Sequence, residues 1–304
     1  MYRTTMLLFF ACGFFCVTSD AYAEAKVKYI ISFSSHKSTC LLRVNDLPGA
    51  DSTLANLRTV SLGINSTAFL ENGSNKIELL MGPMNHLKPD TLYKDSRCTA
   101  IITKATADSS VEVARLTLSV AASGKISAAG SVNHTSPEDK RVTYEGYSED
   151  KSDYGLYKLE SEITLKGLPE WSWTKATPAT DANLSRIRGA YENIWKLMHD
   201  RDADGLKKIS AISVRELAQA EQIPETMIFS STGLLEYVLN EKLRPLPIAW
   251  DKYKLISYRD GRLFRMAVGF FQNSPLKMID EHGTPVYAFS PYFSIIDNKV
   301  VLVR

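Results

Sequence analysis

The sequence has few of the groups on which recognisable enzyme chemistry depends. It holds 5 histidines and 4 cysteines in 304 residues. None of the histidines stands in a HExxH or His-x-x-x-His pattern. A Gly-x-Ser-x-Gly elbow, a glycine-rich phosphate loop and a Rossmann fingerprint are also lacking. We therefore expect no cofactor and no metal, and a catalytic site would have to be assembled from scattered residues.

The chain also has no marked excess of positive or negative charge. There are 36 Lys and Arg residues against 34 Asp and Glu residues, a formal net charge of +2 at pH 7. Proteins that bind nucleic acid or anionic membrane surfaces usually carry a marked basic patch or excess. This balance argues against both partners and favours another protein.

Only one apolar run stands out, at residues 6–17. Arg3 precedes it, and the small residues Ala-Tyr-Ala follow at 21–23, which is the pattern of a secretory signal peptide. The run is short for a transmembrane helix, which needs about 20 apolar residues. We predict a signal peptide over 1–23, no integral membrane segment after cleavage, and a periplasmic or secreted protein. A lipoprotein modified at Cys12 or Cys16 is an alternative that fits the pattern less well.

Cleavage would leave Cys40 and Cys98 as the two remaining cysteines. Disulfides form and persist in exported proteins, so we predict a disulfide between them. Two separately buried thiols are the alternative. A metal pair is less favoured, because no histidine or third cysteine stands at ligand spacing.

Residues 24–170 show the alternating pattern of β-strands, most clearly at Val111–Val120. Turn residues separate the apolar runs, and residues 133–155 predict a long exposed connection. Many short strands at this spacing predict an antiparallel β-sandwich domain. The expected strands are Val27–Phe33, Cys40–Val44, Thr59–Ile64, Lys76–Met81, Thr99–Lys104, Val111–Val120, Lys125–Val132 and Tyr157–Leu165.

Within this region, Ile64–Leu79 contains Leu70, Gly73 and Asn75 followed by alternating apolar residues. The segment resembles the Leu-x-x-Gly-x-Asn stretch of galactose-binding-like jelly-roll domains. That resemblance implies a jelly-roll-like sandwich, with Gly73 at positive φ and Asn75 bracing the loop through backbone hydrogen bonds.

Residues 171–180, here called the joint, separate this region from a second one. Pro169 precedes the joint and Pro178 lies near its end, and proline is unsuited to a helix interior or a central strand. Trp171 and Trp173 would share one face if the segment is extended. Tryptophan is favoured at protein interfaces, so both are candidate binding residues, and burial between two domains is the alternative.

Residues 181–304 predict an α+β domain in which helices come first. An amphipathic helix is expected over 181–199. A capping-box pattern at Ser213–Glu216 predicts the start of a second helix that stops before Pro224, and 234–239 suggests a third. Three hairpins in an antiparallel meander are then expected: Lys252–Tyr258 with Arg262–Phe271, Lys277–Asp280 with Pro285–Phe289, and Tyr292–Ile296 with Val300–Val303. This order of elements resembles nuclear transport factor 2-like and cystatin-like folds.

The turn after the first expected helix has alternating aspartates, as an EF-hand loop does: Asp200, Asp202 and Asp204. Its twelfth position is Ala211, where calcium needs a bidentate glutamate. We expect a solvated turn that does not bind calcium.

Together these features favour an exported, non-enzymatic protein that binds another protein. Export, size, two expected domains and the lack of a catalytic motif make the chain similar in type to immunity proteins, which neutralise antibacterial effectors delivered to the periplasm. The alternatives are an enzyme with its site in the α+β region, and a carbohydrate-binding protein that acts through the sandwich.

Overall fold

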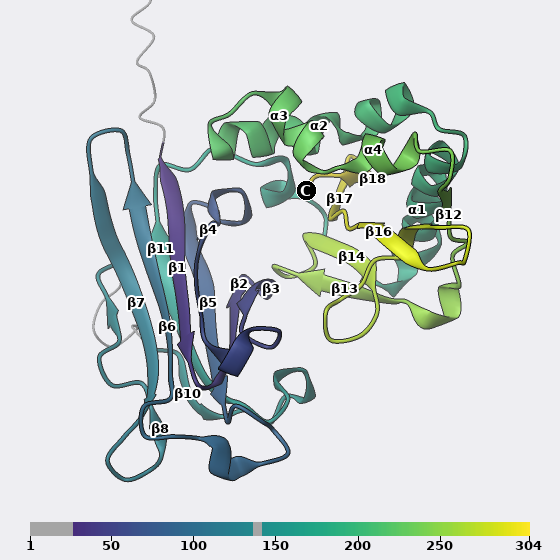
Figure 1. Cartoon of the computed structure of the whole chain (residues 1–304). Helices are drawn as coiled ribbons and strands as arrows, with labels where there is room; N and C mark the ends of the chain where they lie inside the picture. Colours follow the sequence, from purple (N-terminus) through teal and green to yellow (C-terminus); the bar gives the residue numbers. More distant parts are fainter. Residues whose placement is uncertain (1–26, 136–141) are drawn as a thin grey trace, which may run out of the picture.

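The computed structural model describes residues 27–135 and 142–304 (Figure 1). The predicted signal peptide lies outside the described residues. Antiparallel sheet dominates, and the α-helices come late in the chain, as predicted (Figure 1). The described residues contain no helix long and apolar enough to cross a membrane. The division into two domains at the joint stays a prediction, so we refer to a first part, before the joint, and a second part, after it.

The first part contains two antiparallel sheets. One has the order β4-β1-β6-β7-β8, with β9 also pairing with β7, and the other has the order β10-β11-β5-β2-β3. The strands of the first sheet are β1 (Lys28–His36), β4 (Val60–Asn65), β6 (Arg97–Ala105), β7 (Ser110–Val120), β8 (Ile126–Ser127) and β9 (Val132–Asn133). Those of the second are β2 (Thr39–Val44), β3 (Leu47–Asp51), β5 (Gly73–Gly82), β10 (Tyr144–Tyr147) and β11 (Tyr157–Leu165).

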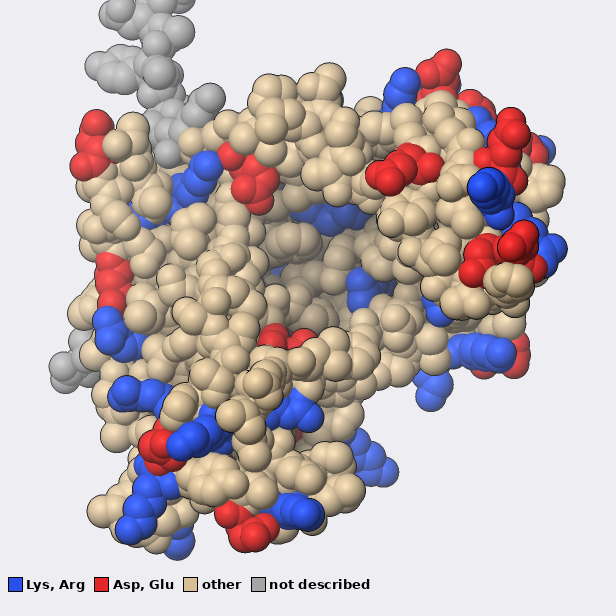
Figure 2. Space-filling model, viewed as in Figure 1, with Lys and Arg blue, Asp and Glu red and all other residues tan. Residues whose placement is uncertain are grey.

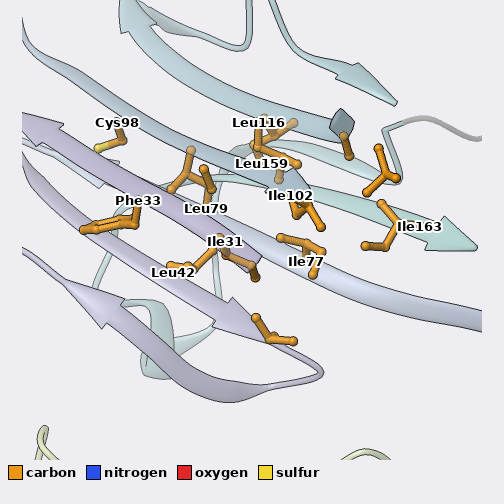
Figure 3. Close-up of a cluster of buried hydrophobic side chains, with 14 of the residues drawn as sticks. Ile31, Phe33, Leu42, Ile77, Leu79, Cys98, Ile102, Leu116, Leu159 and Ile163 are labelled. Carbon is orange, nitrogen blue, oxygen red and sulfur yellow. The ribbon is translucent and has the colours of Figure 1, made fainter. Parts of the chain in front are cut away.

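Both sheets contribute side chains to one apolar core (Figure 3). Ile31 and Phe33 of β1, Ile77 and Leu79 of β5, and their neighbours in the cluster are almost completely buried. In β1 the buried residues alternate with more exposed ones, because successive side chains of a strand point to opposite faces. The predicted alternation is therefore what places these side chains between the sheets.

The predicted disulfide between Cys40 and Cys98 is formed and links β2 of one sheet to β6 of the other. The two Cα atoms lie 5.8 Å apart, and the cysteines are 58 residues apart in sequence. Closing a loop of that length stabilises a fold by about 4 kcal/mol on the chain-entropy model.

Three details of the first part differ from the expected strands. β3 was not expected, because Pro48 and Gly49 interrupt its apolar pattern; it pairs only with β2. β10 lies within the stretch 133–155 that was expected to be a loop, and it forms an edge strand on β11. The expected strand over 125–132 reduces to the short β8 and β9.

The second part opens with four α-helices: α1 (Leu184–His199), α2 (Ala203–Glu221), α3 (Glu225–Ser231) and α4 (Leu234–Val238). The amphipathic pattern located α1 correctly, and its buried residues lie on one face. The predicted helix start at Ser213 is wrong, since Ser213 and Glu216 lie buried inside α2. α2 begins instead after Asp202, whose side chain accepts a hydrogen bond from the Gly205 amide at 2.8 Å.

The three expected hairpins form, but they do not make one continuous meander. One sheet has the order β13-β14-β17-β18, and the other has the order β12-β15-β16. β14 pairs with β17 of the third hairpin. The middle hairpin, formed by β15 and β16, instead pairs with β12 through β15. The strands are β12 (Arg244–Pro245), β13 (Lys254–Tyr258), β14 (Leu263–Ala267), β15 (Leu276–Ile279), β16 (Pro285–Phe289), β17 (Phe293–Ile296) and β18 (Lys299–Leu302). A second core lies between these sheets and α1.

Candidate functional site

Trp171 and Trp173 lie in a third apolar core, between the two parts. They are 2% and 0% exposed, so neither indole is open to a partner in this structure. Trp171 Nε1 donates to the Leu70 carbonyl at 2.9 Å, and Trp173 Nε1 donates to the Ala68 carbonyl at 3.1 Å. Residues 172–175 form a short 3-10 helix in place of an extended segment. This burial favours the alternative interpretation, in which both tryptophans belong to the core between the two parts.

The third core draws residues from both parts and from the joint. Its buried members are Leu47, Ala68, Trp171, Trp173, Ala220, Tyr258, Leu263 and Val303. Large apolar side chains that meet in this way exclude water from the contact between the parts.

Ion pairs border this core on one side. The turn between β13 and β14 carries Arg259 and Arg262, and both bind Glu71 of the first part. Arg262 holds both carboxylate oxygens of Glu71, at 2.7 and 2.8 Å. Burial raises the pKa of Glu71, but the hydrogen bonds from Arg262 and Arg259 outweigh it, so the pKa lies below the ordinary 4.5.

A second ion pair is more deeply buried. Arg304 Nη1 donates to Glu216 of α2 at 2.5 Å, and Arg304 Nε donates to the Ala68 carbonyl at 2.9 Å. The other Glu216 oxygen accepts a hydrogen bond from the Ser172 amide at 2.8 Å. The arginine side chain also lies over the Trp171 ring, at 5.2 Å. This pair therefore ties together α2, the joint and the first part.

The surface between the two parts is hollowed on the face drawn in Figure 2. A cleft of about 420 Å³ has walls from both parts. β2, β3 and residues 152–154 form one wall, and β13, β14 and the loop at 269–272 form the other. A smaller pocket of about 240 Å³ lies within the second part, between α2, α3 and β16. Clefts between structural units are common places for binding sites.

Three exposed aromatic side chains, here called the aromatic rim, line the larger cleft: Tyr154, Phe270 and Phe271. They are 55%, 38% and 51% exposed. The ring centroids of Tyr154 and Phe270 lie 5.0 Å apart, and those of Phe270 and Phe271 lie 4.9 Å apart. Tyr154 comes from the first part and the phenylalanines from the second, so the rim is an apolar patch that spans the cleft.

Arg265 of β14 also lines the cleft and is 7% exposed. Its Nη2 donates to the Gln272 carbonyl at 2.7 Å and lies 3.2 Å from the Gln272 side-chain oxygen. Tyr258 donates its hydroxyl to the same side-chain oxygen. Burial raises the pKa of Tyr258 above its ordinary value, despite the nearby charge of Arg265, so the phenol stays protonated at neutral pH.

Two other charged side chains that line the cleft have partners. Arg43 binds Asp153, which is also 3.1 Å from the Lys158 ammonium group. Asp46 binds Lys76. Arg43 and Asp46 thus belong to ion pairs on the outer face of the β2-β5-β11 sheet, and their charges are already compensated.

The aspartates considered for calcium have other partners. Asp202 caps α2, and Asp200 lies 3.0 Å from the ring of His199. Gly205 allows a close approach, because a Cβ there would lie 2.5 Å from side-chain atoms of Asp202 and Leu197. Residues 27–135 and 142–304 contain no group of three or more His, Cys, Asp or Glu side chains placed to hold a metal ion.

No protein-family model matches the chain, and neither a curated protein nor a solved structure matches it. The resemblances drawn from residue patterns thus gain no support from these comparisons. The local loop geometry expected from the jelly-roll resemblance is present. Gly73 has φ +96°, and Asn75 bonds the Glu71 carbonyl at 2.7 Å and the Glu71 amide at 3.0 Å.

The sequence analysis did not identify Tyr154, Arg265 or the Phe270–Phe271 pair as site residues. It placed both phenylalanines in a strand, whereas β14 ends at Ala267 and the pair stands in the following turn. The available signal was two adjacent aromatics in a stretch bounded by Gly269 and Asn273, residue types that favour turns.

Proposed function

We propose that this is an exported protein without chemistry of its own, which binds another protein through the aromatic rim of the cleft. The observation that supports this most is the contact between Tyr154 and Phe270 at 5.0 Å, with Phe271 beside them and all three exposed. Aromatic residues are the commonest anchors of protein interfaces, and a contiguous exposed set of them marks a candidate interface.

The cleft is less suited to catalysis. Its described lining includes serine, tyrosine, aspartate and arginine side chains but no histidine or cysteine. A serine nucleophile needs a neighbouring base. Of the two aspartates in the lining, Asp46 is bound to Lys76, and Asp51 already accepts a hydrogen bond from the Thr53 amide. Binding is therefore the better account of the residues in the cleft.

The finer form of the proposal is an immunity-type role, in which the partner is an effector protein that reaches the periplasm. The disulfide and the N-terminal pattern fit a protein that works outside the cytoplasm. A binding cleft between two interlocked parts also fits a protein that must hold a partner without changing shape.

Site-specific photo-crosslinking tests the proposal. A photoreactive phenylalanine analogue replaces Phe271 in the full-length protein, produced in its native host and irradiated there. The expected result is one discrete heavier product that contains a second protein, identified by mass spectrometry. The same analogue at Tyr147, an exposed aromatic (64%) outside the cleft, is the matched control. Equal products at both positions, or none at 271, would contradict the proposal.

A further inference from the structure

The cleft contains a buried positive charge without a carboxylate partner among the described residues. Among the described residues, Arg265 donates to Gln272 through Nη2 and forms no ion pair with a carboxylate. Its Nε is sealed from solvent and has no hydrogen-bond partner in the described part of the chain. A buried cation is costly to the fold unless an anion compensates it.

Arg304 is the other deeply buried arginine among the described residues, and it has a carboxylate partner. It is 6% exposed, against 7% for Arg265, and it binds Glu216 at 2.5 Å. No other arginine of the described chain is as deeply buried as these two. Arg265 therefore differs in lacking a counter-charge while lining a cleft, so a ligand is the available source of that counter-charge.

The guanidinium of Arg265 is held in position before any ligand arrives. It lies over the Tyr292 ring at 4.8 Å, and Gln272 fixes one of its nitrogens. Tyr292 in turn packs edge-on against Tyr258, with ring centroids 5.5 Å apart. A planar donor that is already oriented loses little conformational entropy when it binds a carboxylate.

We infer that Arg265 binds a carboxylate group of the partner protein, presented beside an apolar side chain that packs on the aromatic rim. The occupant is a protein segment that ends in an apolar residue, whose C-terminal carboxylate reaches Arg265. The arrangement joins a charge-assisted hydrogen bond at the base of the cleft to apolar contact at its mouth. This inference rests on the proposed function and names what the cleft recognises.

The charges around the cleft favour a carboxylate over a phosphate. Asp51 also lines it and forms no ion pair among the described residues, so it would repel a dianion more strongly than a monoanion. Asp46 is bound to Lys76, while Asp51 accepts a hydrogen bond from the Thr53 amide at 2.7 Å. Arg43, the other cation of the lining, is bound to Asp153.

Small probes test the inference on the purified full-length protein. N-acetyl-phenylalanine carries an aromatic ring and a carboxylate, and N-acetyl-phenylalaninamide differs only in lacking the charge. By titration calorimetry or NMR, the acid is expected to bind about tenfold or more tightly than the amide. Inorganic phosphate at equal concentration is expected not to displace the acid.

Substitutions test whether Arg265 is responsible for the preference for the acid. Arg265→Met is expected to abolish the preference for the acid, and Arg265→Lys to restore part of it. Arg115→Met, which removes an arginine of β7 outside the cleft, is the matched control and should keep the full preference. Should Arg265→Met fail to fold, the chemical shift of the wild-type Arg265 Nε–Hε group gives the same answer, because only the acid is expected to move it.

Equal binding of acid and amide, an unchanged preference in Arg265→Met, or displacement by phosphate would each overturn the inference. The two proposals fail separately. Acid-selective binding at Arg265 without a protein crosslink at position 271 would refute the proposed function alone. A specific crosslink without acid selectivity would refute the carboxylate inference alone.

Discussion

At the scale of single residues, tryptophan and phenylalanine have opposite roles in this molecule. Trp171 and Trp173 are buried where the two parts meet, and each donates its indole N–H to a carbonyl of the first part. Phe270 and Phe271 stand exposed at the mouth of the cleft. Large aromatic side chains serve cores and interfaces equally well, so the sequence alone could not separate these roles.

The burial of Trp173 predicts a large loss of stability on truncation. Trp173→Ala would leave a cavity in the third core and remove one of the two hydrogen bonds to the Ala68 carbonyl, at a cost of about 3–5 kcal/mol in the free energy of unfolding. Urea unfolding followed by circular dichroism measures it. Phe271→Ala is the control and should change stability by no more than about 0.5 kcal/mol. A small effect of Trp173→Ala would show that the third core contributes little.

At the scale of elements, the turn between β13 and β14 is fixed to the first part through Glu71. The folded-state pKa of Glu71 lies below its unfolded-state value. The ion pairs therefore stabilise the fold above the unfolded-state pKa, and this contribution is lost as pH falls through the lowered folded-state pKa.

Glu71→Gln should accordingly destabilise the protein more at pH 7 than at pH 3. The comparison is the difference in unfolding free energy between wild type and variant at the two pH values. Glu112→Gln, which breaks a more exposed pair with Arg115 on β7, is expected to show a smaller pH-dependent difference. A Glu71→Gln difference that is the same at both pH values would contradict the assigned role.

Elements with a strong local pattern were predictable from sequence, and those that depend on distant partners were not. α1 and β7 follow from their hydrophobic periods, and the disulfide follows from the two cysteines that the predicted cleavage would leave. The start of α2 was misplaced, because a capping-box sequence at Ser213 lies inside a helix that Asp202 already caps. No local sequence pattern predicted the cleft, because Tyr154 and Phe270 come into contact only when the two parts pack together.

At the scale of the whole molecule, the third core and its ion pairs predict that both parts unfold together. Leu79→Ala, deep in the first core, should destabilise the protein by about 2–5 kcal/mol. The helix signal of the second part should fall in the same shifted transition as a probe of the first part, the near-ultraviolet circular dichroism of the Cys40–Cys98 disulfide. Helices that melt at the wild-type denaturant concentration in this variant would instead indicate two independent domains.

The central claim, that the aromatic rim binds a protein, is tested most directly by the affinity of the purified protein for the partner identified at position 271. Calorimetry on the wild type, Phe271→Ala and the exposed control Tyr147→Ala gives the comparison. Phe271→Ala is expected to weaken binding by about 2 kcal/mol, roughly thirtyfold, with an unchanged melting temperature. Tyr147→Ala should bind as the wild type does. Unchanged affinity in Phe271→Ala would contradict the claim.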